Sequence, residues 1–449
     1  MLPSRQTIRA ALFAVILPAS LAPGAAAAPA PDSLAGDPGL GPSTAAPWNP
    51  PSPVPGSEPW EAALRVPGKI VSLPFEALGA ATEATLEYVE SSNLLPRVEA
   101  LLALRATVGL DVRPAGLGDR TGFGGEAQYN PRWFRALVAD VSGSTAGYNR
   151  ERVRLSRSFA SVEYESDWRP RELFFGEGLG SSKRSVSAYA SQVELARLGL
   201  EYTPGGAPAS RWPRLQARAW AGPRDVVLRR GRDPRKPSIT ESFPSTSAAE
   251  LDTHVEHFVY GVRAALDTRR GSPHWTNGWR ISGQAERYDK SLDWLALRSG
   301  DAPERPFTRY VAEGEAGISF LRDPRTVRLA LRVVDSELGA GSGLFLVPDL
   351  ARLGGREGLS GFEPGRFQAL DSAVGKLTYL FPLGRYVELD THAEAGGVYS
   401  RLRDARVSSL KNSYGVQLRI RSLTTLLGFV GVDWCDEGAR VNFSLGGIE

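Results

Sequence analysis

Apolar and polar side chains alternate in segments of about ten residues along most of the chain from residue 122 onward. The clearest segment runs from Tyr386 to Tyr399 and divides into two faces. One face carries Val387, Leu389, Thr391, Ala393 and Ala395, and the other carries Glu388, Asp390, His392 and Glu394. Tyr414 to Arg421 repeats the pattern, with Arg419 among its polar positions. A period of two predicts strands, and the turn residues between the segments predict an antiparallel sheet.

Such a sheet fits either a soluble sandwich with one solvated face or a membrane barrel. The strands are long, recur without a central helix, and carry small, aliphatic and aromatic residues on one face, as a lipid-facing band requires. We therefore predict an all-β fold, a transmembrane antiparallel β-barrel. About ten strands precede Gly339 and about five follow a glycine-rich loop at 339–371, whereas barrels of this class have an even number. One further strand, near Thr107 to Arg113 or within Ser185 to Arg230, makes the prediction about sixteen strands.

Composition excludes several other classes of protein. The 449 residues are 42% hydrophobic and 23% charged, values that are ordinary for a soluble protein. A helical membrane protein would show runs of about 20 apolar residues, and none follows the N-terminal region. The net charge of +3 is too small to indicate a nucleic-acid partner. Cys435 is the single cysteine, which excludes an intrachain disulfide and a cysteine metal cluster.

Four segments follow one another along the chain. Residues 1–28 have the basic start, apolar stretch and small-residue end of a secretory signal peptide. Residues 29–59 are rich in Pro, Ala, Gly and Ser, which predicts a disordered linker. Residues 60–105 place apolar side chains three and four positions apart, which predicts short amphipathic helices. Residues 106–449 form the predicted barrel.

The run LARLGGREGLSGFEPGRFQALDSAVGKLTYLFPL, Leu350 to Leu383, resembles the segment that identifies the BamA/TamA family, a bacterial surface antigen superfamily of outer-membrane barrels. In that family a Gly-Gly turn leads to an Arg-Gly-Phe/Tyr tripeptide at the tip of a loop folded back into the barrel. The matching residues here are Gly354, Gly355, Gly361, Phe362, Arg366 and Phe367, and Ser360 stands at the position of the arginine. Weaker likenesses in the same order extend back to Glu172. The resemblance implies a barrel with an infolded loop and a role in inserting or translocating proteins or lipids.

Ser360 departs from the family pattern, because it stands where the loop arginine is expected. The family arginine meets acidic and aromatic groups on the lumen wall, a charge-assisted contact in a confined site. One hypothesis is that Arg356 or Arg366 replaces it by reaching Glu394 or Asp390. The alternative is that both arginines are solvated loop charges. The group Glu388, Asp390, His392, Glu394 and Arg419 would then form a lumenal charge network of its own.

Two further departures concern the ends of the chain. The last residues are Gly-Gly-Ile-Glu, so Phe443 is the nearest candidate for the terminal aromatic that barrel-insertion machinery reads. The segment 60–105 is too short for the periplasmic POTRA modules of the family's assembly factors, and it lacks their strand signals. We therefore expect a barrel without POTRA modules, with the helices at the periplasmic mouth or on the inner leaflet.

An enzymatic role is not indicated. His254 and His257 are three positions apart and so lie on opposite faces of a strand. His392 is flanked by acidic residues, an arrangement more typical of a charge network than of a catalytic base. We expect no enzyme activity, no cofactor and no metal.

Two functional classes remain. The first is a protein that assists insertion or translocation at the bacterial outer membrane. Its partners would be outer-membrane lipids, unfolded outer-membrane proteins or periplasmic factors. The second is a passive pore or structural barrel.

Overall fold

The computed structural model describes residues 108–114, 122–203, 213–233, 235–243, 251, 254–272, 275–290, 306–320, 325–339, 346–383, 387–421 and 426–445. The predicted signal peptide, linker and helical segment 60–105 lie outside these residues and stay predictions. No helix in the described part of the chain is long and apolar enough to cross a membrane.

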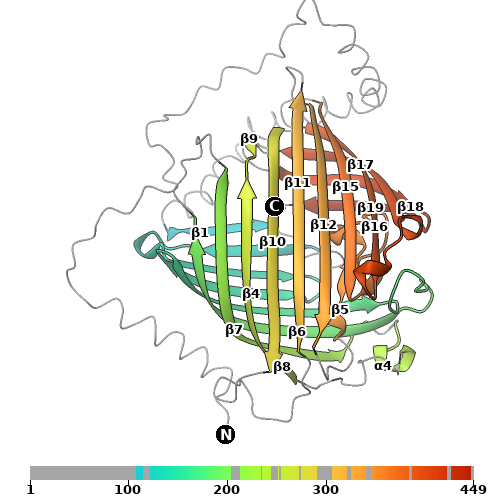
Figure 1. Ribbon diagram of the computed structural model, residues 1–449, viewed down its shortest axis with the longest axis horizontal. Helices are drawn as coiled ribbons and strands as arrows, with labels where there is room; N and C mark the ends of the chain where they lie inside the picture. The colour runs from blue at the N-terminus through green and yellow to red at the C-terminus, as the bar shows by residue number, and fades with distance from the viewer. Residues whose placement is uncertain are drawn as a thin grey trace, which may run out of the picture. The chain divides into compact units, whose positions relative to one another are not determined.

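Sixteen strands of the described chain form one antiparallel sheet in which each strand pairs with the next one along the chain (Figure 1). They are β1 (Leu110–Pro114), β2 (Gly124–Tyr129), β3 (Leu137–Ser144), β4 (Asn149–Arg157), β5 (Ala160–Phe174), β6 (Ser187–Tyr202), β7 (Arg214–Arg230), β8 (His254–Asp267), β10 (Trp275–Lys290), β11 (Phe307–Phe320), β12 (Arg325–Leu338), β15 (Asp371–Pro382), β16 (Val387–Tyr399), β17 (Lys411–Arg421), β18 (Leu426–Cys435) and β19 (Gly438–Leu445). The short strand β9 (Arg270–Ser272) pairs with β10 and is part of the turn between β8 and β10, so it is not counted among the sixteen. The predicted fold class and strand number are confirmed.

The two faces of the sheet differ as the period-two pattern predicted. On β12, Val327, Leu329 and Leu331 are exposed on the outer face. The alternate residues Arg328 and Arg332 point inward and form ion pairs. The outer face therefore has the apolar band that lipid contact requires, and the charged side chains collect in the lumen.

Antiparallel order sorts the connections onto two rims. The turn rim carries the start of β1, the end of β19 and the connections after β2, β4, β6, β8, β11, β15 and β17. The loop rim carries the remaining connections, among them the one that contains α4 (Ile239–Ser242), at the lower edge of Figure 1. Three of the short 3-10 helices lie on these rims: η2 (Arg132–Phe134) on the turn rim, and η6 (Leu402–Asp404) and η7 (Val407–Ser409) on the loop rim.

The first and last strands form a seam. Within the described residues β1 pairs with β2 and β19 pairs with β18, and the sheet is not closed by pairing between β1 and β19. The two sides of the seam nevertheless approach each other, because the ring of Phe123, directly before β2, and the ring of Phe443 on β19 have their centroids 6.1 Å apart. The seam leaves backbone edges without strand partners.

The connection from β12 to β15 folds back into the lumen from the loop rim. Its described part contains η4 (Val347–Asp349), β13 (Ala351–Leu353), η5 (Gly355–Glu357) and β14 (Phe367–Ala369), and β13 pairs with β14. The first residues of this infolded loop, Leu346, Val347 and Leu350, pack in a buried apolar cluster with inward side chains of the barrel wall. The loop tip has a second cluster around Leu359, Phe362 and Phe367.

Candidate functional site: the infolded loop and the lumen wall

The glycine pair of the loop motif makes the tip turn possible. Gly354 and Gly355 have φ of 118° and 67°, backbone conformations that residues with a side chain rarely adopt. A Cβ on Gly354 would also lie 2.0 Å from the carbonyl oxygen of Glu363. The Gly354 amide donates to the Gly358 carbonyl oxygen at 2.7 Å and closes the turn. The tip that follows, Leu359 to Phe362, is thereby held against the wall.

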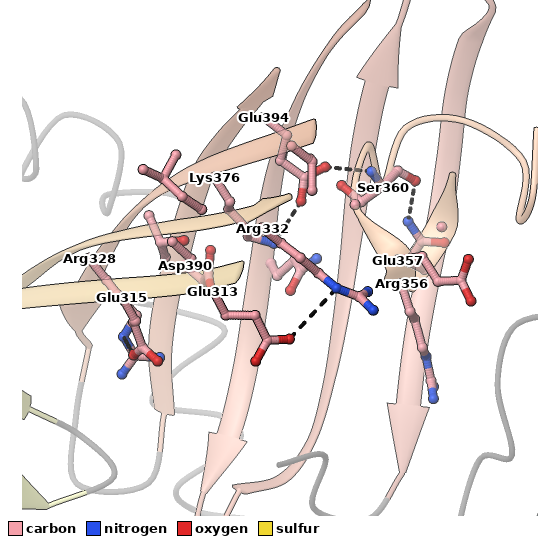
Figure 2. Close-up of a pocket in the computed structure, with 18 of the residues that line it drawn as sticks. Glu313, Glu315, Arg328, Arg332, Arg356, Glu357, Ser360, Lys376, Asp390 and Glu394 are labelled. Atoms are coloured by element: carbon pink, nitrogen blue, oxygen red, sulfur yellow. Dashed lines mark hydrogen bonds and ion pairs between the residues drawn. The ribbon is translucent and has the colours of Figure 1, made fainter. Parts of the chain in front are cut away.

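Ser360 occupies the centre of the contact between loop and wall. Its backbone amide donates to Glu394 of β16 (Figure 2). Its hydroxyl lies 3.2 Å from Nε2 of His392. The Asn442 side-chain amide of β19 donates to the Ser360 carbonyl oxygen at 3.2 Å. Ser360 is buried, so each of these polar groups needs the partner that it has.

The lumen wall around Ser360 supplies its own cations. His392 lies between two carboxylates, with Nδ1 3.0 Å from Asp390 and Nε2 2.8 Å from Asp433. Lys376 lies 3.0 Å from Glu394 (Figure 2). Arg419 lies 3.3 Å from both Glu388 and Asp390. The structure therefore brings the five predicted network residues together around the loop tip and adds Lys376 and Asp433 to them.

Gly415 of β17 leaves the space that this network needs. A Cβ at this position would lie 1.8 Å from Oδ1 of Asp433 and 2.5 Å from Nε2 of His392. A side chain here and the ion pair between His392 and Asp433 therefore exclude each other.

The next two residues of the tip attach the loop to the last strands. The Gly361 carbonyl oxygen accepts from the Cys435 thiol at 3.2 Å, and a Cβ on Gly361 would lie 2.8 Å from the Trp434 carbonyl oxygen. The Phe362 carbonyl oxygen accepts from Arg440 of β19. The ring of Phe362 packs edge-on against Phe367, with centroids 5.0 Å apart.

Arg366 does not reach Glu394 or Asp390, contrary to the first hypothesis from the sequence. It binds Glu437, between β18 and β19, at 2.9 Å and donates to the hydroxyl and carbonyl oxygen of Ser181 at 2.7 Å. Its guanidinium also lies over the Phe367 ring, 4.7 Å from the centroid. Arg366 is only 4% exposed, so the alternative of a solvated charge is wrong for this residue as well.

Arg356 also takes a different partner from the one proposed. It donates to the Ser444 hydroxyl of β19 at 3.2 Å. The carboxylates that it was expected to reach already have cations from the wall, Lys376 for Glu394 and Arg419 for Asp390. Arginine is therefore not needed on the loop to neutralise this site.

The other end of the infolded loop is attached to the opposite side of the barrel. Arg352 binds Glu172 of β5 and the Tyr189 hydroxyl of β6, both at 2.6 Å. Asp349 binds Arg224 of β7 at 2.5 Å. Burial raises the pKa of Asp349, but the guanidinium groups of Arg224 and Arg309 outweigh it and hold that pKa below its usual value. The loop thus spans the lumen from β5–β7 to β16–β19.

A cavity of roughly 570 Å³ remains beside the loop tip (Figure 2). Charges on its wall pair between β11 and β12: Glu313 with Arg332 at 3.6 Å, and Glu315 with Arg328 at 3.5 Å. A lumen of paired opposite charges presents little selective field to a permeating ion.

Ser360, His392 and Asp390 have the connectivity of a catalytic triad, but their surroundings oppose acyl transfer. Nε2 of His392, which a serine needs as its base, already faces Asp433. The Ser360 amide, a natural oxyanion donor, is occupied by a carboxylate. An imidazole with a carboxylate at each nitrogen donates an N–H hydrogen bond from both nitrogens, so neither nitrogen is free to accept a proton. The group serves as a contact between loop and wall. Among the described residues, no group of three His, Cys, Asp or Glu side chains is placed to hold a metal ion.

Sequence reasoning missed Lys376, Asp433, Arg440 and Asn442 as members of this site. The last two alternate with outward residues of β19, so the period-two pattern of RVNFSL, Arg440 to Leu445, could have placed them in the lumen. Phe443, the residue after Asn442, points to the outer face and is 57% exposed.

Comparison with known proteins supports the fold. No protein-family model matches the chain, and no curated protein is significantly similar to it in sequence. The crystal structure of BamA from Haemophilus ducreyi lacking POTRA domains 1-3 aligns with a TM-score of 0.50 and 12% identity, over 75% of this chain and 69% of that chain. CdiB from Acinetobacter baumannii aligns with a TM-score of 0.44 and 13% identity, over 75% and 58% of the chains. CdiB from Escherichia coli aligns with a TM-score of 0.46 and 12% identity, over 74% and 61%.

The chain spans less than two thirds of the length of each CdiB chain and slightly more than two thirds of the length of the BamA chain. The barrel is of the BamA type in fold. Membership of the BamA/TamA family itself stays a prediction from the loop motif.

Proposed function

We propose that this protein is exported to the bacterial outer membrane and assists the insertion or translocation of proteins or lipids there. One observation carries the proposal: β19, the last strand, is held from inside by the loop while its outer backbone edge lacks a strand partner in the described sheet. Its partners are outer-membrane lipids and unfolded outer-membrane proteins or periplasmic factors.

The inward side chains of β19 explain how an open edge can be kept in place. Arg440, Asn442 and Ser444 each contact the infolded loop, through Phe362, Ser360 and Arg356. The strand therefore keeps its position without β1 beside it. An incoming strand can pair with its free N–H and C=O groups by β-augmentation, because an open edge is a template for pairing.

A passive pore is the alternative function, and the contents of the lumen oppose it. The infolded loop brings its own apolar clusters into the barrel, and the wall charges beside it are paired. We expect the purified protein to give small, infrequent currents in planar bilayers. A large and steady current would favour the pore.

Depletion of the protein in its own host tests the proposed function. We expect other outer-membrane barrels to decrease in the membrane proteome while lipoproteins stay constant, with recovery when the wild-type chain is restored. A proteome that is unchanged after complete depletion would contradict the proposal.

A further inference from the structure

The outer face of the barrel has a hollow floored by alanine. Ala217, Ala219 and Ala221 of β7 pair in register with Tyr202, Leu200 and Leu198 of β6. On the other side Ala219 and Ala221 pair with Val262 and Tyr260 of β8. These flanking side chains are exposed and bulky, so they rise above the short alanines. Two hollows of roughly 540 and 650 Å³ open here and share Leu200 and Ala219. We call this feature the alanine trough.

The trough ends at a cluster of arginine and aromatic side chains on the turn rim. Arg157 lines one hollow and Phe159 lines the other. Arg132 and Arg135 lie on the nearby turn between β2 and β3, with Trp133 between them. Trp133 is 77% exposed and Phe159 is 63% exposed. All three arginines are exposed, and none forms an ion pair with a described residue.

The described residues of the turn rim are mostly basic. The turns on this rim and the residues flanking them include Arg132, Arg135, Arg157, Arg269 and Arg270, against one acidic residue, Asp267, which pairs with Arg269. The described connections of the loop rim carry both signs, for example Asp233 and Glu241 among the basic residues after β7. In the described chain the excess of positive charge therefore lies on the turn rim.

We propose that the alanine trough and the arginines at its end form a binding site for an anionic phospholipid. One acyl chain lies over Ala219, and the headgroup phosphate binds Arg157. Trp133 and Phe159 lie at the membrane–water interface. Aromatic side chains favour the membrane–water interface, and guanidinium groups form strong charge-assisted hydrogen bonds with phosphate. The site depends on the barrel spanning a membrane and is independent of any insertion activity.

Native mass spectrometry of the purified protein, with added phosphatidylglycerol or phosphatidylethanolamine, tests the site. We expect the wild-type protein to retain phosphatidylglycerol preferentially. Arg157→Gln should lower phosphatidylglycerol binding about fivefold, since a basic residue near an anionic surface contributes roughly 1 kcal/mol. Phosphatidylethanolamine binding should fall less, because its ammonium group offsets the charge of its phosphate. Ala219→Leu should reduce binding of both lipids, because its side chain fills the trough.

Two controls match these variants. Arg406→Gln removes an exposed arginine on the loop rim, and Ala316→Leu enlarges an exposed alanine on the outer face of β11. Neither should change lipid binding. A difference in gel migration between unheated and heated samples checks that every variant is folded. Equal retention of the two lipids by the wild-type protein, or equal losses in the variants and their controls, would overturn the site and indicate only the unselective lipid layer around any barrel.

Discussion

At the scale of single residues, the serine at position 360 is matched by changes in its surroundings. A loop arginine would bring a positive charge to the acidic wall. Here Lys376 and His392 already supply that charge from β15 and β16. The loop contributes a backbone amide and a hydroxyl, which need less space than a guanidinium. The contact between loop and wall is therefore kept, but its positive charges come from the wall instead of the loop.

Gly415→Ala tests this arrangement directly. The added methyl would lie 1.8 Å from Asp433, so Asp433 or His392 must move. Overpacking of this kind costs about 1–3 kcal/mol. We expect a lower urea midpoint for unfolding of the reconstituted barrel. Gly314→Ala is the matched control, since a Cβ there has no atom within 4 Å. Equal midpoints for the two variants would contradict the role of Gly415.

The sequence predicted part of this site and missed the rest for a physical reason. Period-two alternation within β16 identifies Glu388, Asp390, His392 and Glu394 as lumenal, because it depends only on local geometry. The partners Asp433 and Asn442 come from later strands, and their alignment depends on register across the sheet. Arg366 was misassigned because its partner Ser181 is 185 residues away in sequence, on another loop.

At the scale of elements, the infolded loop is a strut across the lumen. Arg352 and Gln368 attach it to β5 and β6, and Ser360 to Phe362 attach it to β16, β18 and β19. Arg366 lies between these groups and joins Ser181 after β5 to Glu437 after β18. Movement of the last strands is thereby coupled to the opposite side of the barrel.

Arg366→Ala should loosen this strut. Hydrogen bonds to a buried charge contribute about 1.5–3 kcal/mol, so transient opening of the loop should increase roughly 10- to 100-fold. Chymotrypsin cleavage within the loop of the membrane-embedded protein measures this opening. Arg403→Ala, which removes an exposed arginine in η6, should have no effect. If Arg366→Ala resisted cleavage as well as the wild type, Arg366 would not anchor the loop.

Elements were easier to predict than contacts. Strands after Gly339 alternate cleanly, and all five are present. The stretch Ser185 to Arg230 was poorly defined in sequence because β6 and β7 face apolar clusters at their loop-rim ends, where both faces are buried and alternation is lost. β1 was uncertain because it has only five residues.

At the scale of the whole molecule, a filled lumen and an unpaired seam occur together. The strut occupies the interior, so transport through the centre of the barrel is opposed. Within the described residues, the backbone edges without strand partners lie instead in the wall, at β1 and β19. A protein of this form would act on its partners sideways, at the boundary with lipid.

Covalent closure of the seam should show whether the protein acts on its partners through the barrel wall. In a Cys435→Ser background, Phe123→Cys is combined with Phe443→Cys, because the native rings at these two positions lie 6.1 Å apart across the seam. Ala127→Cys with Val141→Cys, already paired between β2 and β3, is the control. Insertion of a reporter barrel is followed in membrane vesicles from cells producing each variant. We predict that closing the seam stops insertion, that reduction restores it, and that the control link changes nothing. Insertion that continues at the wild-type rate through a closed seam would contradict the account.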